Sequence, residues 1–438
     1  MQALFLDLRI AFSSLIEHRR RALFLGVAVA SVTTLFVLLN ALSAGIRHTL
    51  IDTAVTLSTG HLNVGGFYKV TPGQAGPVVT EYAKVREVVQ KALPEMDFAV
   101  ERGRGWGKLV SDTGSMQAGI AGVDLDREGS LRSVLRIQSG DIEQLNQPNT
   151  ILIFDAQAKK LKLKVGDALT ISAQTTRGVA NTIDLRVAAI AEDVGLLSQW
   201  NVFVPNDALR QLYQLRPDVT GAIQIHLKPQ YLNDLGPLAA RLRTSLEEAG
   251  YGVMDPDPRP FWMKFESVTR EDWTGQKLDV TSWEDELSFM MWTLQAIGGL
   301  SLVLMIILIG IVVTGIMNTM WIAIRERTRE IGTLRAIGMQ RVSVVRMFLL
   351  ESFLLGLIGT LVGALAGQLI AAALNAAQIH VPLSVQLFLM SDTLKLAVLP
   401  RALGGAVLLI SVVTGLAAIY PAFRASRLKP AEAMSHFG

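Results

Sequence analysis

The chain contains no cysteine among its 438 residues. This absence excludes a disulfide framework, a thiolate-bound metal site and a thiol nucleophile. Charged residues are also scarce, at 18%, whereas hydrophobic residues make up 50% of the sequence. The formal net charge of +3 is too small to indicate nucleic-acid binding. This combination of few charges and many apolar residues is typical of a protein that crosses a membrane.

Motifs for nucleotide hydrolysis and for acyl transfer are missing as well. The one Gly-Lys pair, Gly107-Lys108, lacks the upstream glycine and the following Ser or Thr of a phosphate-binding loop. No Gly-x-Ser-x-Gly elbow and no His-Glu-x-x-His helix occurs, and the six histidines are scattered along the chain. We therefore expect a non-catalytic chain without a cofactor or metal of its own, and a stand-alone membrane enzyme is the least favoured class.

Four long apolar segments are each close to or above the roughly 20 residues that a helix needs to cross a bilayer. The first follows Arg19–Arg21 and is longer than the roughly 7–15 residues of a signal-peptide core, which favours an uncleaved anchor over a cleaved leader. The second would form a helix of roughly 50 Å at 1.5 Å per residue, so it either tilts or leaves the membrane as a stalk. We place the four membrane segments at residues 22–43, 289–324, 347–375 and 402–423.

The distribution of Lys and Arg predicts the orientation of these segments. Basic residues are dense before the first segment, between the second and third, and after the fourth, whereas the third loop holds only Lys395 and Arg401. Since basic loops stay in the cytoplasm, we expect residues 1–21, 325–346 and 424–438 to be cytoplasmic. Residues 44–288 and the short loop 376–401 then lie outside.

The region 44–288 has the mixed pattern of an α+β domain. Helical periodicity covers residues 79–93, 155–161, 206–213 and 235–249. Short β-branched or alternating runs predict strands at 60–64, 116–122, 150–154, 168–173, 183–190, 201–204 and 222–227. The predicted fold class is therefore a membrane domain of four transmembrane helices with a large α+β extracytoplasmic domain inserted between helices 1 and 2.

Two further clusters have open interpretations. Five aromatic residues precede the second segment: Phe261, Trp262, Phe265, Trp273 and Trp283. They either anchor this region at the membrane interface or pack on the stalk, or they contact an amphiphilic substrate. In the third segment, Gly359, Gly363 and Gly367 recur at four-residue spacing. Small residues at this spacing let helices approach closely, either within the chain or at a seam between two copies.

The basic loop between the second and third segments also carries apolar residues. Ile331, Leu334 and Ile337 recur at three-residue spacing among the arginines, which predicts an amphipathic helix within residues 322–345. A loop that serves only to orient the membrane segments would need neither this apolar face nor the glycines Gly332 and Gly338. The helix is therefore expected to bind a partner.

The motifs of this loop and of the C-terminus resemble those of the FtsX/MacB-type ABC permeases. In the loop, the similar residues are Asn318-Thr319-Met320, Arg325 to Gly332 and Leu334-Arg335-Ala336-Ile337-Gly338. At the C-terminus, they run from Tyr420-Pro421-Ala422 to Glu432-Ala433-Met434. Gly60-His61-Leu62-Asn63-Val64 and Val165-Gly166-Asp167 resemble the external domain of the MacB and LolC/LolE branches. Together with one long external domain between the first two segments, the resemblance covers essentially the whole chain.

The resemblance implies a multi-pass permease of the bacterial inner membrane whose large domain lies in the periplasm. Its implied partners are a dimeric ABC ATPase that binds ATP and Mg, a second copy or homologous permease, membrane lipids, and a periplasmic adaptor or chaperone, with no nucleic acid. Relative to the lipoprotein-releasing subunits, Gln174–Asn181 is too short for the hook by which such a subunit recruits its chaperone, and Asp255–Asp279 is extra sequence.

The basic loop is by this resemblance the coupling helix that docks on the ATPase. Its apolar side would fill a groove and its arginines would pair with acidic residues at the rim. The simpler alternative is that the arginines only fix the orientation or bind anionic lipid headgroups. The residues assigned to this interface are Arg325, Glu326, Arg327, Arg329, Glu330, Ile331, Gly332, Leu334, Arg335, Ile337 and Gly338.

The implied function is mechanotransmission, in which ATP hydrolysis by the separate subunit moves the periplasmic domain. We expect this motion to extract or export lipoproteins or other amphiphiles from the inner membrane. The alternative is an FtsX-like signalling protein that activates a cell-wall hydrolase without transport. The external features similar to MacB favour transport.

Overall fold

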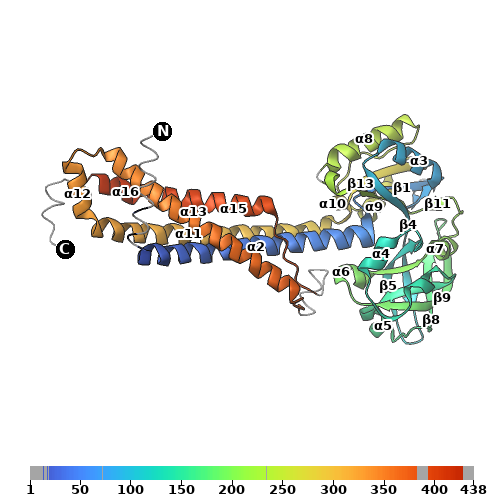
Figure 1. Cartoon of the computed structure of the whole chain (residues 1–438). Coiled ribbons are helices and arrows are strands. Elements are labelled where there is room, and N and C mark those ends of the chain that lie inside the picture. The colour runs from blue at the N-terminus through green and yellow to red at the C-terminus, as the bar shows by residue number, and fades with distance from the viewer. Residues whose placement is uncertain are drawn as a thin grey trace. The chain divides into compact units, whose positions relative to one another are not determined.

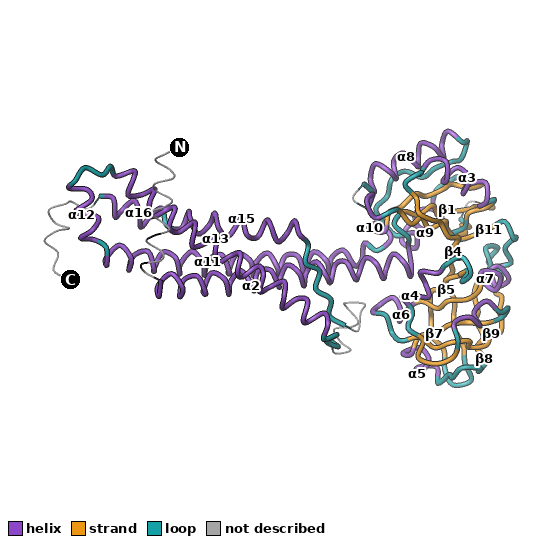
Figure 2. The backbone as a smooth tube through the Cα atoms, in the orientation of Figure 1, coloured by secondary structure: helices purple, strands orange, loops and turns teal. Residues whose placement is uncertain are grey.

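The structure, a computed structural model, describes residues 13, 17, 19–71, 73–232, 234–381 and 393–427. The chain divides into two compact units. Unit 1 comprises Met1–His48, Leu294–His380 and Thr393–Gly438, and unit 2 comprises Thr49–Thr293 and Val381–Asp392. The predictions for most of 1–18, for 382–392 and for 428–438 lie outside the described residues. Within the described part, the strands of the large sheet lie in unit 2, whereas unit 1 is mainly helical (Figure 2).

Unit 1 is built on four long apolar helices that lie alongside one another (Figure 1). Their apolar windows have mean hydropathies of 2.0 to 2.9, and all four are long enough to cross a membrane. Two short helices, α12 and α16, accompany them. The bounds are α2 Arg19–Ala54, α11 Ser288–Glu326, α12 Thr328–Ala336, α13 Arg341–Ala376, α15 Pro400–Ala417 and α16 Ile419–Ser426.

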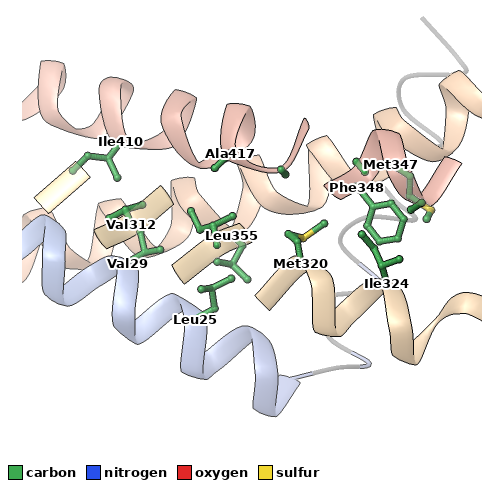
Figure 3. Packing of buried hydrophobic residues seen from close by; sticks show 14 of the residues in the cluster. Leu25, Val29, Val312, Met320, Ile324, Met347, Phe348, Leu355, Ile410 and Ala417 are labelled. Carbon is green, nitrogen blue, oxygen red and sulfur yellow. The ribbon is translucent and has the colours of Figure 1, made fainter. Parts of the chain in front are cut away.

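The core of unit 1 is a cluster of buried apolar side chains from all four long helices (Figure 3). Phe348 is among its members with an exposed fraction of 0%. Since the remaining surfaces of these helices are themselves apolar, the core occupies one stripe of each helix and leaves the other faces uncovered. The labelled members are Leu25, Val29, Val312, Met320, Ile324, Met347, Phe348, Leu355, Ile410 and Ala417.

The glycines of α13 lie against α2 of the same chain. A Cβ atom added to Gly363 would clash with the carbonyl oxygen of Ala30, at 2.3 Å. A Cβ atom added to Gly367 would lie 2.9 Å from Val37 Cγ1. Gly359 approaches the carbonyl oxygen of Gly26 in the same way. Thr34 Oγ1 donates a hydrogen bond of 3.0 Å to the carbonyl of Gly363. Of the two interpretations, packing within the chain is the one that the structure displays for these glycines.

Unit 2 contains an 11-stranded sheet in the order β13-β1-β12-β4-β5-β10-β7-β9-β6, with β2 added on β1 and β8 paired with β4 and β9. Most neighbours are antiparallel, but β5 pairs with β10 and β7 with β9 in parallel. The bounds are β1 Leu62–Thr71, β2 Gln74–Gly76, β4 Met96–Val110, β5 Ser115–Val123, β6 Ile137–Gly140, β7 Thr150–Phe154, β8 Ala168–Gln174, β9 Ala180–Ala191, β10 Asn201–Pro205, β12 Ala222–Leu227 and β13 Gly275–Ser282. A separate small pair joins β3 Val79–Thr80 to β11 Val219–Thr220.

The long strand β4 divides unit 2 into two lobes. Its first half pairs with β12 in the lobe whose core includes Val64, Val85 and Leu242, and its second half pairs with β5 in the other lobe. The helical segments of unit 2 are η1 Val55–Thr59, α3 Tyr82–Ala92, α4 Gly129–Val134, η2 Ile142–Asn146, α5 Asp155–Leu161, α6 Gly195–Trp200, α7 Asn206–Tyr213, η3 Pro229–Tyr231, α8 Leu235–Glu248, α9 Phe261–Arg270 and α10 Trp283–Glu286.

The predicted α+β character of this region is confirmed, but β4 was not predicted. Its second half alternates glycine with Arg104 and Trp106, a composition that disfavours strands. The glycines serve close packing, because a Cβ on Gly105 would collide with the ring of Tyr213 in α7. The Tyr213 hydroxyl accepts from the Trp106 amide at 2.7 Å and donates to its carbonyl at 2.8 Å, and burial raises the pKa of Tyr213 to about 12.

Candidate functional site

The loop between α11 and α13 folds into a separate short helix, α12. Helix α11 continues through Glu326, so Arg325 and Glu326 belong to its last turn, and the chain bends at Arg327, which has φ −103° and ψ 14°. Helix α12 ends at Ala336, and Gly338 after it has a φ of +112°, which favours glycine. The amides of Gly338 and Met339 donate to the carbonyls of Arg335 and Leu334, which closes the helix with a Schellman motif.

Polar side chains hold both ends of α12 on the other helices of unit 1. At its start, Arg327 contacts Glu351 of α13 at 3.1 Å and Glu330 at 3.0 Å. Near its end, Arg335 Nη1 donates to the carbonyl of Ser426 in α16 at 2.7 Å. Glu351 is only 5% exposed, so its pairing with Arg327 satisfies a charge within the helix bundle. A displacement of α12 would therefore be passed to α13 and α16.

The outer surface of α12 is only partly the one that the sequence predicts. Ile331 is 2% exposed and belongs to the core of unit 1, and Gly332 is buried beside it. Leu334 and Ile337 are 38% and 81% exposed. The three apolar residues therefore have different roles: Ile331 fixes the helix to the bundle, whereas Leu334 and Ile337 are exposed.

In unit 2, the end of helix α2 is fixed by a buried arginine of β4. After Ala54 the helix continues as one turn of π-helix, η1, an arrangement that is rare and often functional. Arg102 Nη1 donates to the carbonyl of Leu57 at 3.0 Å, and its second nitrogen pairs with the buried Glu128. Gln224 of β12 in addition donates to the carbonyl of Ser58. The last turn of this helix is thus bonded directly to the sheet.

The start of α11 is fixed in unit 2 by a second buried carboxylate, Glu286. Its Oε1 accepts from Thr281 at 2.8 Å and from Asn63 at 3.2 Å, and it lies 3.5 Å from Arg104 Nη2. Glu286 and Arg104 are 5% and 8% exposed. Charge-assisted hydrogen bonds are strong in a buried, water-free environment, provided that every polar group of the network has a partner. This network joins β1, β4, β13 and α10 immediately before α11 begins.

The aromatic residues before α11 do not form one surface. Trp262 and Phe265 on α9 are 55% and 39% exposed, and Met263 between them is 45% exposed. Trp283, by contrast, is 6% exposed and packs inside unit 2. Among the five predicted aromatics, only Trp262 and Phe265 thus stand open on α9.

The other two predicted aromatics face arginine and lysine side chains. Phe261 lies under the guanidinium of Arg104 at 4.3 Å. Trp273 is flanked by the amines of Lys69 and Lys277, at 4.9 and 5.0 Å. Both rings therefore form cation–π contacts within unit 2, unlike the exposed rings of Trp262 and Phe265 on α9.

Helix α9 is attached to the sheet by a fully buried ion pair. Lys264 Nζ lies 2.7 Å from Asp279 Oδ2 on β13, and the two side chains are 0% and 3% exposed. Burial raises the pKa of Asp279, and the neighbouring Lys264 opposes that shift. Because removal of either partner would leave a charge buried alone, this pair holds the exposed face of α9 in a fixed orientation on unit 2.

Sequence analysis missed Arg102, Arg104 and Glu286. Within β4 the run Glu101-Arg102-Gly103-Arg104 places three charged residues in one strand, and this density is the one signal that could have identified a buried polar site. Glu286 sits among Glu284 and Asp285 in an acidic run, which reads as solvent-exposed. Among the described residues, no group of three or more His, Asp or Glu is arranged to hold a metal ion.

The C-terminal part of the chain is similar to known proteins. Residues 302–430 match the family model "FtsX-like permease C-terminal". The chain is 38% identical over 121 residues to the "Macrolide export ATP-binding/permease protein MacB" of Nitrobacter winogradskyi, which is 28% of this chain and 17% of that protein. It is 21% identical over 328 residues to the "Lipoprotein-releasing system transmembrane protein LolE" of Haemophilus influenzae, covering 72% of each. The chain thus spans about one sixth of its macrolide-exporter relative.

Among solved structures, the periplasmic region of MacB from Actinobacillus actinomycetemcomitans is similar at 12% identity. The match covers 54% of this chain and 97% of that one, with a TM-score of 0.30.

Proposed function

We propose that this chain, whose residues 302–430 are an FtsX-like permease domain homologous to MacB, is the permease subunit of an ATP-driven ABC transporter. It couples ATP hydrolysis in a separate ATPase subunit, which binds ATP and Mg, to a conformational change of unit 2. The observation that carries the proposal is the form of α12. This helix is fixed to the bundle through Ile331 and Arg327 and presents Leu334 and Ile337 outward.

The four long helices are proposed to span the bacterial inner membrane. Basic residues gather at Arg19–Arg21, at the end of α11, at the start of α13 and in α16, which supports a cytoplasmic α12 and a periplasmic unit 2. Helix α11 has 39 residues, or roughly 58 Å at 1.5 Å per residue, well beyond a bilayer core of about 30 Å. It runs without interruption from Ser288 beside Glu286 to the turn that begins α12.

Transmission then follows from the bonded ends of two helices. When the ATPase shifts α12, helix α11 passes the displacement to the Glu286 network, because that network bonds the residues preceding α11 to three strands. Helix α2 is bonded to the same sheet through η1 and Arg102. No catalytic group of this chain is required. The two junctions convert movement of the membrane helices into movement of unit 2.

The proposed cargo is a lipoprotein or another amphiphile of the inner membrane. Two observations support this choice: Trp262, Met263 and Phe265 present an apolar face on α9, and the similarity to a lipoprotein-releasing protein extends over 72% of both chains. The ion pair between Lys264 and Asp279 keeps this face in place without filling it. A second copy of the permease is expected to complete the transporter.

The experiment reconstitutes the chain with its cognate ATPase in proteoliposomes. ATP turnover is measured with an acylated lipoprotein and with the same protein lacking its acyl chains, and transfer to a soluble acceptor is followed in parallel. Stimulation and transfer only with the acylated form support the proposal. If no amphiphile changes the rate of ATP turnover and unit 2 captures a cell-wall hydrolase, the chain signals without transport.

A further inference from the structure

A cleft of about 400 Å³ lies in unit 1, where the ends of α11 and α16 meet. It is lined by Trp321, Ile324, Arg325, Arg424 and Ala425. Ile324 and Ala425 are buried and form its apolar part, whereas both arginines are exposed. Its volume lies within the range of about 300–1,000 Å³ that is typical of small-molecule sites.

The two arginines of the cleft have no acidic partner among the residues that the structure describes. This distinguishes them from Arg327, which contacts two carboxylates only two residues after Arg325. The guanidinium of Arg424 lies 5.6 Å from the ring centre of Trp321, and Tyr420 packs edge-on against the same ring at 6.2 Å. The stacking orients Arg424 and leaves its N–H groups available for an anion.

The position of the cleft along the helices indicates which anion it meets. Trp321, Ile324 and Arg325 are among the last six residues of the candidate span Leu294–Glu326. Arg424 and Ala425 are among the last three of the span Pro400–Ser426. These ends are the depth at which lipid headgroups lie, and Trp and Tyr favour the same depth. Around the cleft, Ile322, Tyr420 and Phe423 are 47%, 56% and 49% exposed, as expected for side chains beside acyl chains.

We propose that this cleft binds the headgroup of an anionic phospholipid from the inner leaflet of the membrane. Arg325 and Arg424 donate to the phosphate oxygens, a geometry for which the planar guanidinium is well suited. Trp321 and Ile324 contact the glycerol and the first methylenes of the lipid. Basic pockets between membrane helices on the cytoplasmic side are suited to this class of ligand.

The inference rests on the membrane placement in the proposed function, but its test is independent of transport. The lipid would connect α11 with α16, whose Ser426 carbonyl accepts the hydrogen bond from Arg335 of α12. Headgroup binding would therefore stabilise the helix that supports the proposed docking surface.

The test uses the purified full-length chain without ATPase or cargo. Native mass spectrometry measures retention of phosphatidylglycerol and of zwitterionic phosphatidylcholine during a lipid titration, with and without inorganic phosphate as a competitor. The variants are Arg325→Gln/Arg424→Gln and Arg424→Gln alone. The charge-matched control is Arg341→Gln/Arg401→Gln, since both residues are exposed and lie away from the lining of the cleft. Monodispersity on size-exclusion chromatography confirms that each variant is folded.

The wild-type chain should retain one phosphatidylglycerol more tightly than phosphatidylcholine. The double variant should weaken this binding about tenfold, since two charge-assisted contacts are lost, and Arg424→Gln alone should weaken it less. The control should match the wild type. Equal retention of both lipids, or unchanged affinity in the double variant, would overturn the proposal. Displacement by millimolar inorganic phosphate would instead assign the cleft to free phosphate and reject the lipid.

Discussion

Replacement of Ile337 by alanine tests the docking surface of α12 most sharply. The change removes three carbon groups, each contributing about 0.8 kcal/mol when transferred from water to a buried site. Ile337 is 81% exposed in the free chain, so about 2 kcal/mol of this burial is still available for a partner. Leu334 is 38% exposed, which leaves only about 0.9 kcal/mol for the equivalent change. The structure therefore ranks Ile337 above Leu334.

The assay measures the dissociation constant of the labelled ATPase from the chain in nanodiscs. Ile337→Ala should weaken binding roughly thirtyfold and Leu334→Ala roughly fivefold, at about 1.4 kcal/mol per factor of ten. Ile379→Ala serves as a matched control, because this isoleucine is 42% exposed and lies beyond the far end of α13. Ile331→Asp should destabilise unit 1 itself, since Ile331 is buried in the core. A change below twofold for Ile337→Ala, or a larger effect of Leu334→Ala, would refute the assigned surface.

Three further predictions concern the Glu286 junction, the packing of α2 on α13 and a buried histidine. Glu286→Gln leaves Arg104 buried without its counter-charge, so we expect a loss of about 3 kcal/mol in the free energy of opening α10, measured as faster hydrogen exchange there. Gly363→Leu should overpack α2 against α13 and lower the unfolding temperature of the chain in detergent, whereas Gly404→Leu, in open space, should not. Burial lowers the pKa of His226 to about 3, below its ordinary value of 6.5. Its stabilising contribution is thus complete above pH 6.5 and declines as the pH falls toward 3, by about 2 kcal/mol at pH 5. In thermal unfolding, the wild type should lose stability more steeply between pH 6.5 and pH 5 than His226→Gln, which keeps the other shifted groups such as His61.

The sequence predicted features that repeat along the chain. Apolar runs located the four long helices of unit 1, and three-residue periodicity located α12. Strands β7 and β12 coincide with their predicted ranges at both ends, since β7 is a continuous apolar or β-branched run and β12 alternates apolar residues with Gln224 and His226. Local patterns of this kind carry enough information because they reflect burial of one face or of a whole segment.

The sequence could not predict which residues meet across the fold. Ile331 and Ile337 have equivalent places in the amphipathic pattern, but packing in the core of unit 1 buries only the first. Glu286 and Arg102 look like ordinary charged residues in the sequence, because their partners Arg104 and Leu57 are brought to them only by the tertiary fold. Trp283 and Trp262 are the same residue type in one aromatic-rich segment. However, Trp283 begins the capped helix α10 and is buried in unit 2, whereas Trp262 is exposed. The positions of buried charges depend on tertiary packing, which no local pattern encodes.

The central claim is that ATP binding in a partner subunit is transmitted to the two junctions of unit 2. Hydrogen exchange of the reconstituted permease–ATPase complex tests it directly, by comparing the nucleotide-free state with a state trapped by a hydrolysis-deficient ATPase and ATP. Exchange should change in Val55–Thr59 and Trp283–Glu286 and stay constant in α8, which lies outside both junctions. Identical exchange in both junctions, in a complex that binds ATP and hydrolyses it when the ATPase is intact, would contradict mechanical transmission through this chain.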